Sequence, residues 1–164
     1  MARTHRHLAL MVALTLMACG DTQPAESGPL DPTEPSVPAF EGTFAALQAL
    51  LFDGQGCTAG ACHDAAAAGG LDLSEGVAYD QLVDVTSAGS SLSRVYPGDR
   101  MRSYLYLKLL AAQDPEVEIS GSPMPIGTPP IPEELLDALR LWIYAGAPEN
   151  ETVIGTEALL GVPL

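Results

Sequence analysis

The stretch "GCTAGACHDA", residues 56–65, holds two thiols and an imidazole close together. Cys57 and Cys62 are two of the chain's three cysteines, and His63 directly follows the second of them. Side chains of these types at such short spacing can attach a haem covalently, bind a metal ion, or form a short disulfide. Which of these applies depends first on the compartment, because oxidising compartments do not leave thiols free.

The N-terminus predicts export. Arg3 and Arg6 precede an apolar run over residues 8–18, which is too short to span a bilayer permanently and is typical of a signal peptide. The run ends in "LMAC", which resembles the lipobox of bacterial lipoproteins, where the cysteine (here Cys19) is lipidated and becomes the new N-terminus. We therefore expect a signal peptide over residues 1–18 and a lipid-anchored protein of the cell envelope, on the periplasmic or cell-surface face. The alternative is an ordinary secreted protein with a chance cysteine.

The charge of the chain limits its partners. The sequence has 7 basic and 21 acidic residues, a formal charge of −14. Removing Arg3 and Arg6 with the signal peptide leaves five basic residues against 21 acidic ones, a charge of −16. Such a surface repels nucleic acid and anionic headgroups, so we expect no nucleic-acid partner and a membrane contact only through the lipid.

Composition divides the exported chain into three parts. Residues 19–38 are rich in proline and acidic residues and poor in large apolar ones, which predicts a disordered tether. Residues 39–149 have the size of one small domain. Residues 150–164 form a C-terminal tail that either packs as an edge segment or trails, and the sequence leaves both readings open.

The domain is expected to be mainly α, with three or more helices and long loops. Apolar residues recur at helical spacing in residues 39–54, 99–113 and 129–148, and the last segment carries one apolar stripe, made of Leu135, Leu136, Leu139, Trp142 and Ile143. A short "YDQLVDV", residues 79–85, has the only alternating, strand-like pattern. Loops this long are unusual unless something organises them, and a bound cofactor would do so.

The cysteine stretch favours haem attachment over a disulfide or a zinc site. Covalent haem attachment needs two nearby thiols and a histidine directly after the second, usually as Cys-x-x-Cys-His. Here "TAGA" makes the spacing two residues longer, while the Cys62–His63 adjacency is kept. A Cys57–Cys62 disulfide in a haem-free structural or binding lipoprotein is the alternative. Zinc is a weaker reading, because the domain has no fourth cysteine or histidine.

A second iron ligand is expected from the proline-rich segment "GSPMPIGTPP", residues 121–130. Met124 lies there between two prolines, which stiffen the backbone that would present its thioether. The competing methionine, Met101, lies between two arginines and is expected near the surface. Four cations fall within 15 residues and either pair with haem propionates or form a solvated helix face: Arg94, Arg100, Arg102 and Lys108.

Taken together, the chain resembles the cytochrome c superfamily, and most of all the small exported bacterial domains of planctomycete type. The resemblance rests on "ALLFDGQGCTAGACHD", "GLDLSEGVAYDQLVDV", "RVYPGDRMRSYLYLKL", "PMP" and "LRLWIYAGAP", which together cover residues 40–148. It implies haem c thioethers at Cys57 and Cys62, His63 as proximal ligand, Met124 as distal ligand, and first and last helices packed together. The implied function is one-electron transfer to an unidentified redox protein, and no enzyme motif is evident.

Overall fold

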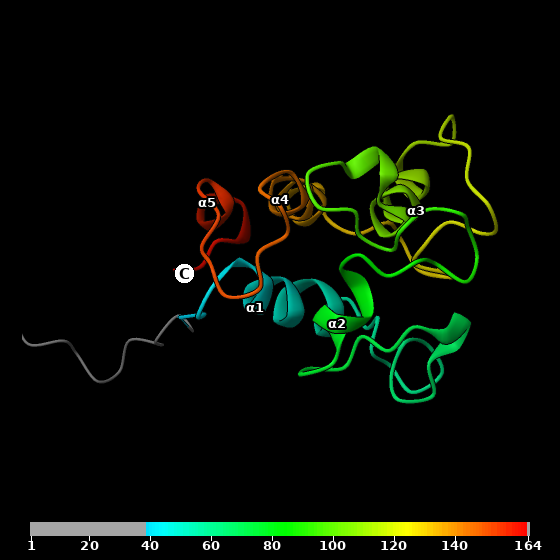
Figure 1. Ribbon diagram of the computed structural model, residues 1–164, viewed down its shortest axis with the longest axis horizontal. Coiled ribbons are helices and arrows are strands. Elements are labelled where there is room, and N and C mark those ends of the chain that lie inside the picture. The colour runs from blue at the N-terminus through cyan, green and yellow to red at the C-terminus, as the bar shows by residue number, and fades with distance from the viewer. Residues whose placement is uncertain (1–38, 164) are drawn as a thin grey trace, which may run out of the picture. The chain divides into compact units, whose positions relative to one another are not determined.

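The computed structural model of the protein describes residues 39–163. The expected signal peptide, the lipidated Cys19 and the tether up to residue 38 lie outside these residues. Within residues 39–163 the chain is mainly helical, with five α-helices and no β-strand (Figure 1). This confirms the predicted fold class at the level of a small α domain. None of the described helices is long and apolar enough to cross a bilayer.

The first predicted helix begins later than its apolar pattern does. It consists of α1, Thr43–Leu47, and a π-helical continuation, Gln48–Asp53. A Cβ atom on Gly42 would lie 3.1 Å from the backbone of residues 150 and 151, so a larger residue there would push this segment away from the start of α1. Leu47 and Leu51 are fully buried, as expected from the helical spacing of their apolar neighbours.

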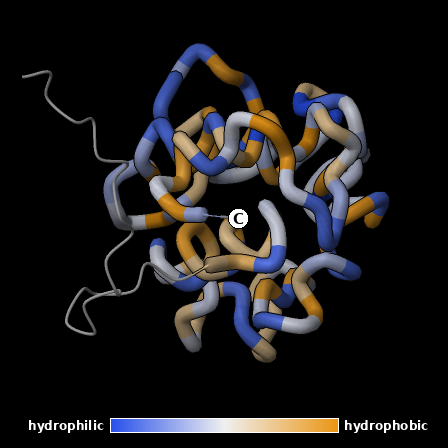
Figure 2. The backbone as a smooth tube through the Cα atoms, turned by 90° about the vertical axis from the view of Figure 1, so that its left-hand side faces the viewer, coloured by the Kyte–Doolittle hydropathy of each residue, from blue (hydrophilic) through white to orange (hydrophobic). Residues whose placement is uncertain are grey.

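The other two predicted helices are present. The middle one is α3, Tyr104–Gln113, preceded by a 3₁₀ turn, Arg100–Arg102. The last is α4, Glu133–Tyr144, with two glutamates at the positive end of its dipole. All five members of its predicted stripe are buried: Leu135, Leu136, Leu139, Trp142 and Ile143. Figure 2 shows hydrophobic and hydrophilic residues alternating at short intervals, as expected of helices with one buried face.

The first and last predicted helices pack together around an aromatic cluster. The ring centroids of Phe44 on α1 and Trp142 on α4 are 5.3 Å apart, and Tyr79 stacks edge-on against Phe44 at 5.2 Å. The Trp142 indole Nε1 donates a hydrogen bond of 2.8 Å to the carbonyl of Pro148. Its only polar group is therefore satisfied in a side chain that is completely buried.

Two short helices lie outside the three segments in which the sequence predicts helices. The segment with the strand-like pattern contains α2, Ala78–Leu82, and only its next residue, Val83, makes an isolated bridge to Val95. The C-terminal segment contains α5, Thr156–Leu160. It packs on α4 and α1, and the hydroxyls of Thr43 and Thr156 share a buried hydrogen bond of 2.8 Å. The tail therefore belongs to the core of the domain and does not trail.

Candidate functional site

The cysteine stretch forms a loop that backbone hydrogen bonds hold against the end of the first helix. The N–H of Cys57 donates to Phe52 O at 2.8 Å, and the N–H of His63 donates to Cys57 O at 2.9 Å. Leu73 N then donates to His63 O at 2.7 Å, which ties the far side of the loop to the buried Leu73. The structure thus places Cys57, Cys62 and His63 on one loop that is held by backbone hydrogen bonds.

The imidazole of His63 is oriented by its own loop. Its Nδ1 lies 3.0 Å from the carbonyl oxygen of Ala68. A carbonyl can only accept, so Nδ1 is the donor in this bond, and in the neutral imidazole Nε2 is then the nitrogen with the lone pair. An imidazole whose Nδ1–H is held by a backbone carbonyl is the usual arrangement of a histidine that ligates a metal through Nε2. The chemistry of His63 therefore suits an axial ligand.

Both thiols of the loop are free in the structure, so the alternative disulfide is not formed in it. Cys57 is partly buried against the core, and its Sγ donates a weak hydrogen bond to Leu51 O at 3.6 Å. Cys62 is exposed. Burial, and to a smaller extent the charges of Cys62 and Asp53, raise the pKa of Cys57 to about 11 against an opposing backbone hydrogen bond. Cys57 is therefore a protonated thiol at neutral pH.

This shift predicts a pH dependence of stability in the haem-free chain. Between its ordinary pKa of 9.0 and about 11, Cys57 is deprotonated in the unfolded chain but keeps its proton in the folded one. The contribution of Cys57 to the free energy of unfolding is complete below pH 9 and is lost as the pH rises to 11. The loss amounts to about 2–3 kcal/mol. Urea unfolding at several pH values should show this loss. Cys57→Ala should remove most of it, and an unchanged slope in that variant would contradict the assignment.

The described residues give no support to a zinc site. Residues 39–163 contain no group of three or more histidine, cysteine, aspartate and glutamate side chains placed to hold a metal ion. A structural zinc site needs about four such ligands arranged tetrahedrally. The donors gathered on the loop are two thiols and one imidazole, a set that fits covalent haem attachment with one axial ligand.

Met124 lies on a different segment, after α3. Its side chain is partly buried and packs against the core, and its N–H donates to Lys108 O at 3.0 Å. Lys108 Nζ also donates to Ser122 O at 2.6 Å, so α3 holds the proline-rich segment at two points. In Figure 1 this segment and the cysteine loop lie on the same side of the view, the former above the latter. The structure describes no contact between Met124 and His63.

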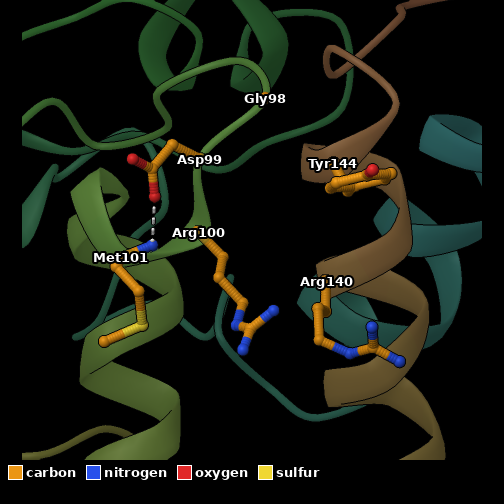
Figure 3. A pocket seen from close by; sticks show the side chains of 6 residues that line it. All are labelled: Gly98, Asp99, Arg100, Met101, Arg140 and Tyr144. Carbon is orange, nitrogen blue, oxygen red and sulfur yellow. Dashed lines mark hydrogen bonds between the residues drawn. The ribbon is translucent and has the colours of Figure 1, made fainter.

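Met101 is placed as expected, near the surface. Its side chain is 54% exposed and lines a small hollow of about 260 Å³ between the 3₁₀ turn and α4. Figure 3 shows Arg100 reaching into this hollow, with Arg140 and Tyr144 on the α4 side. Asp99 accepts a hydrogen bond from Met101 N at 2.9 Å and so caps the turn. Met101 is thus part of an exposed turn rather than of the core.

Of the four clustered cations, Arg100 and Arg102 are exposed, as a solvated face requires, and pairing with haem propionates stays a prediction. Among the described residues none of the four forms an ion pair with a carboxylate. Three lie over tyrosine rings: Arg102 is 3.6 Å from the Tyr96 centroid, Lys108 is 5.1 Å from Tyr104, and Arg100 is 5.9 Å from Tyr106. These cations are therefore held largely by cation–π contacts.

Arg94 differs from the other three because it is buried. Its guanidinium donates to the backbone carbonyls of Gln81 and Gly70 and to the Gln81 side-chain oxygen. It therefore joins the end of the cysteine loop to α2. Sequence reasoning missed this role, since nothing in the local pattern distinguishes Arg94 from its exposed neighbours.

Comparisons with protein-family models, curated proteins and solved structures find no match to this chain.

Proposed function

We propose that the protein is a lipid-anchored, mono-haem c-type cytochrome that transfers single electrons outside the cytoplasm. The observation that carries the proposal is the orientation of His63, whose Nδ1 is held by Ala68 O while Nε2 is free, on one loop with two free thiols. Haem iron supplies one-electron chemistry when it is bound there. The resemblance to cytochrome c domains supports the same reading.

Different residues of the chain would attach the haem, ligate its iron and hold the loop in place. Cys57 and Cys62 would attach the porphyrin through thioethers, and His63, whose ring is held by Ala68 O, would ligate the iron through Nε2. Met124, on its doubly held segment, would supply a second iron ligand. Arg94 joins the residues after the cysteine loop to α2 and so limits movement of the loop.

The test is covalent haem retention. Full-length protein expressed with a haem-attachment machinery should be coloured and keep its iron porphyrin through a denaturing gel. Cys62→Ala should lose most of that haem, because only one thioether can form. A colourless protein would reject the cytochrome, and a colourless protein whose mass shows Cys57 and Cys62 two hydrogens lighter would establish the disulfide-bearing lipoprotein.

The membrane anchor has its own test, since Cys19 lies outside the described residues. On the lipoprotein proposal, the wild-type chain fractionates with membranes and Cys19→Ser moves it to the soluble fraction or blocks its processing. The expected shift is nearly complete, because a lipidated N-terminal cysteine is the anchor that the sequence predicts. Membrane retention with normal cleavage in Cys19→Ser would place the anchor elsewhere.

A further inference from the structure

A turn at residues 67–70, called the 67–70 turn below, carries the carbonyl that orients the imidazole of His63. This carbonyl belongs to Ala68, and its oxygen lies 3.0 Å from His63 Nδ1. Three residues of the turn have a left-handed backbone, with φ values of 50° at Ala67, 65° at Gly69 and 71° at Gly70. Alanine rarely adopts such a φ, so contacts from neighbouring residues must keep the turn in this conformation.

The 67–70 turn has almost no side chain of its own with which to pack. It consists of two alanines and two glycines, and Ala68, Gly69 and Gly70 are exposed. Its backbone hydrogen bonds stay close in sequence, since Ala68 N donates to Cys62 O at 3.0 Å and Gly70 N donates to Ala67 O at 2.7 Å. These bonds shape the turn but do not fix it relative to the rest of the domain.

Arg94 supplies the link between the turn and the rest of the domain. Its Nη2 donates to Gly70 O, and among the described residues this is the only hydrogen bond that reaches the turn from outside residues 57–73. Its Nη1 donates to the backbone oxygen of Gln81 at 2.8 Å and to the Gln81 side-chain oxygen at 3.0 Å. The planar fork of the guanidinium therefore sets the separation between the turn and α2.

The buried position of Arg94 indicates that these donors matter more than its charge. The side chain is 9% exposed, and among residues 39–163 the only ion pair joins Arg140 and Asp137. All hydrogen bonds of the Arg94 guanidinium go to neutral oxygens. A cation buried without a carboxylate is costly, and an apolar side chain could fill the same volume. Only a forked donor can hold both carbonyl groups at once.

The backbone of Arg94 is fixed in turn, and it leads to the helix that holds Met124. Arg94 N donates to Val85 O at 2.7 Å, and Leu105 N, at the start of α3, donates to Arg94 O at 2.9 Å. One turn further along α3 a backbone carbonyl accepts from Met124 N at 3.0 Å. The 67–70 turn beside His63 is thus tied, through Arg94, to the helix that carries the Met124 segment.

We propose that Arg94 is a positioning residue for His63. By holding Gly70 O it keeps Ala68 O where that oxygen accepts from His63 Nδ1, and so it keeps the lone pair of the neutral ring on Nε2. The inference rests on the proposed function for the role of His63 as an iron ligand. The positioning itself needs no haem, so the two proposals can fail separately.

Nitrogen-15 NMR of the exported, haem-free protein labelled at histidine tests the proposal. His63 is the only histidine after residue 18, so one ring gives all the imidazole signals once the signal peptide is removed. At a pH where the ring is neutral, the wild type should show mainly the Nδ1–H form. Arg94→Met should lower the ratio of the Nδ1–H form to the Nε2–H form by on the order of fivefold, the effect expected when one hydrogen bond is lost.

Two further variants separate the fork from the charge. Arg102→Met is the matched control, because Arg102 is exposed over the Tyr96 ring, and it should change the ratio by less than about twofold. Arg94→Lys keeps the charge and most of the stem, but a single ammonium cannot hold two carbonyls as the fork does. Its ratio should therefore lie between those of the wild type and Arg94→Met.

A second measurement covers the case in which the haem-free wild type or Arg94→Met is unfolded, as judged by the dispersion of its amide signals. In the ferrous, haem-loaded protein, Arg94→Met should make the His63 Nδ1–H exchange with water at least about fivefold faster than in the wild type. An unchanged ratio or exchange rate in folded Arg94→Met, or equal changes in Arg102→Met, would overturn the positioning role and leave the cytochrome proposal standing. A colourless protein with the expected ratios would reject the cytochrome and leave the positioning of His63 by Arg94 intact.

Discussion

On the proposed function, Met124→Ala is expected to lower the reduction potential of the haem-loaded protein by on the order of 0.2 V. A thioether stabilises ferrous over ferric iron, so its loss should lower the potential. The position that it leaves would be open to water or to added ligands. Redox titration gives the potential. The weak sulfur-to-iron charge-transfer band of the ferric protein reports the ligand directly and should disappear.

Met101→Ala is the matched control for this experiment. Met101 is 54% exposed on the 3₁₀ turn, whereas Met124 is partly buried against the core. The control should therefore leave both the potential and the charge-transfer band unchanged. If the band survives in Met124→Ala and disappears in Met101→Ala, the ligand assignment is wrong although the cytochrome proposal stands. A wild-type protein that holds haem without the band would instead have an open sixth position, because His63 is the only histidine after residue 18.

Trp142→Ala should have the largest effect on folding, a loss of about 3–5 kcal/mol in the free energy of unfolding. Its side chain is completely buried, contacts the rings of Phe44 and Tyr79, and donates to Pro148 O. The substitution leaves a large cavity between α1 and α4 and an unpaired carbonyl. Urea unfolding followed by far-UV circular dichroism measures the loss without relying on the fluorescence of the chain's only tryptophan.

Tyr144→Ala provides the comparison on the same helix. Tyr144 lies near the end of α4 and is 77% exposed, so its removal should cost less than about 1 kcal/mol. Similar losses in the two variants would show that the aromatic cluster does not dominate the stability of the domain.

The sequence predicts those parts of the fold that depend on long periodic patterns. The stripe of α4 is the clearest case, because its five apolar residues repeat over a 12-residue helix and all are buried. α2 and α5 each have only five residues, too few to separate a helical period from an alternating one. The packing of their neighbours, rather than any local pattern, determines their conformation.

The candidate site is predictable only where its residues are close in sequence. Cys57, Cys62 and His63 stand in one short motif, so their proximity follows from the chain itself. Arg94 joins Gly70 and Gln81 across 24 and 13 residues, and the aromatic cluster brings Phe44, Tyr79 and Trp142 together from three helices. Such juxtapositions are set by how the loops meet, which no periodicity encodes.

Backbone hydrogen bonds join the two ends of the described chain, and this has a mechanical consequence. Phe40 N donates to Pro163 O, and Thr43 N donates to Glu151 O. Tension applied through the segment before residue 39 therefore acts first on these bonds and on the buried threonine pair beneath them. The cysteine loop begins beyond the first helix, outside this path of force. Pulling residues 39 and 163 apart should therefore separate α5 from α1 before it strains the cysteine loop.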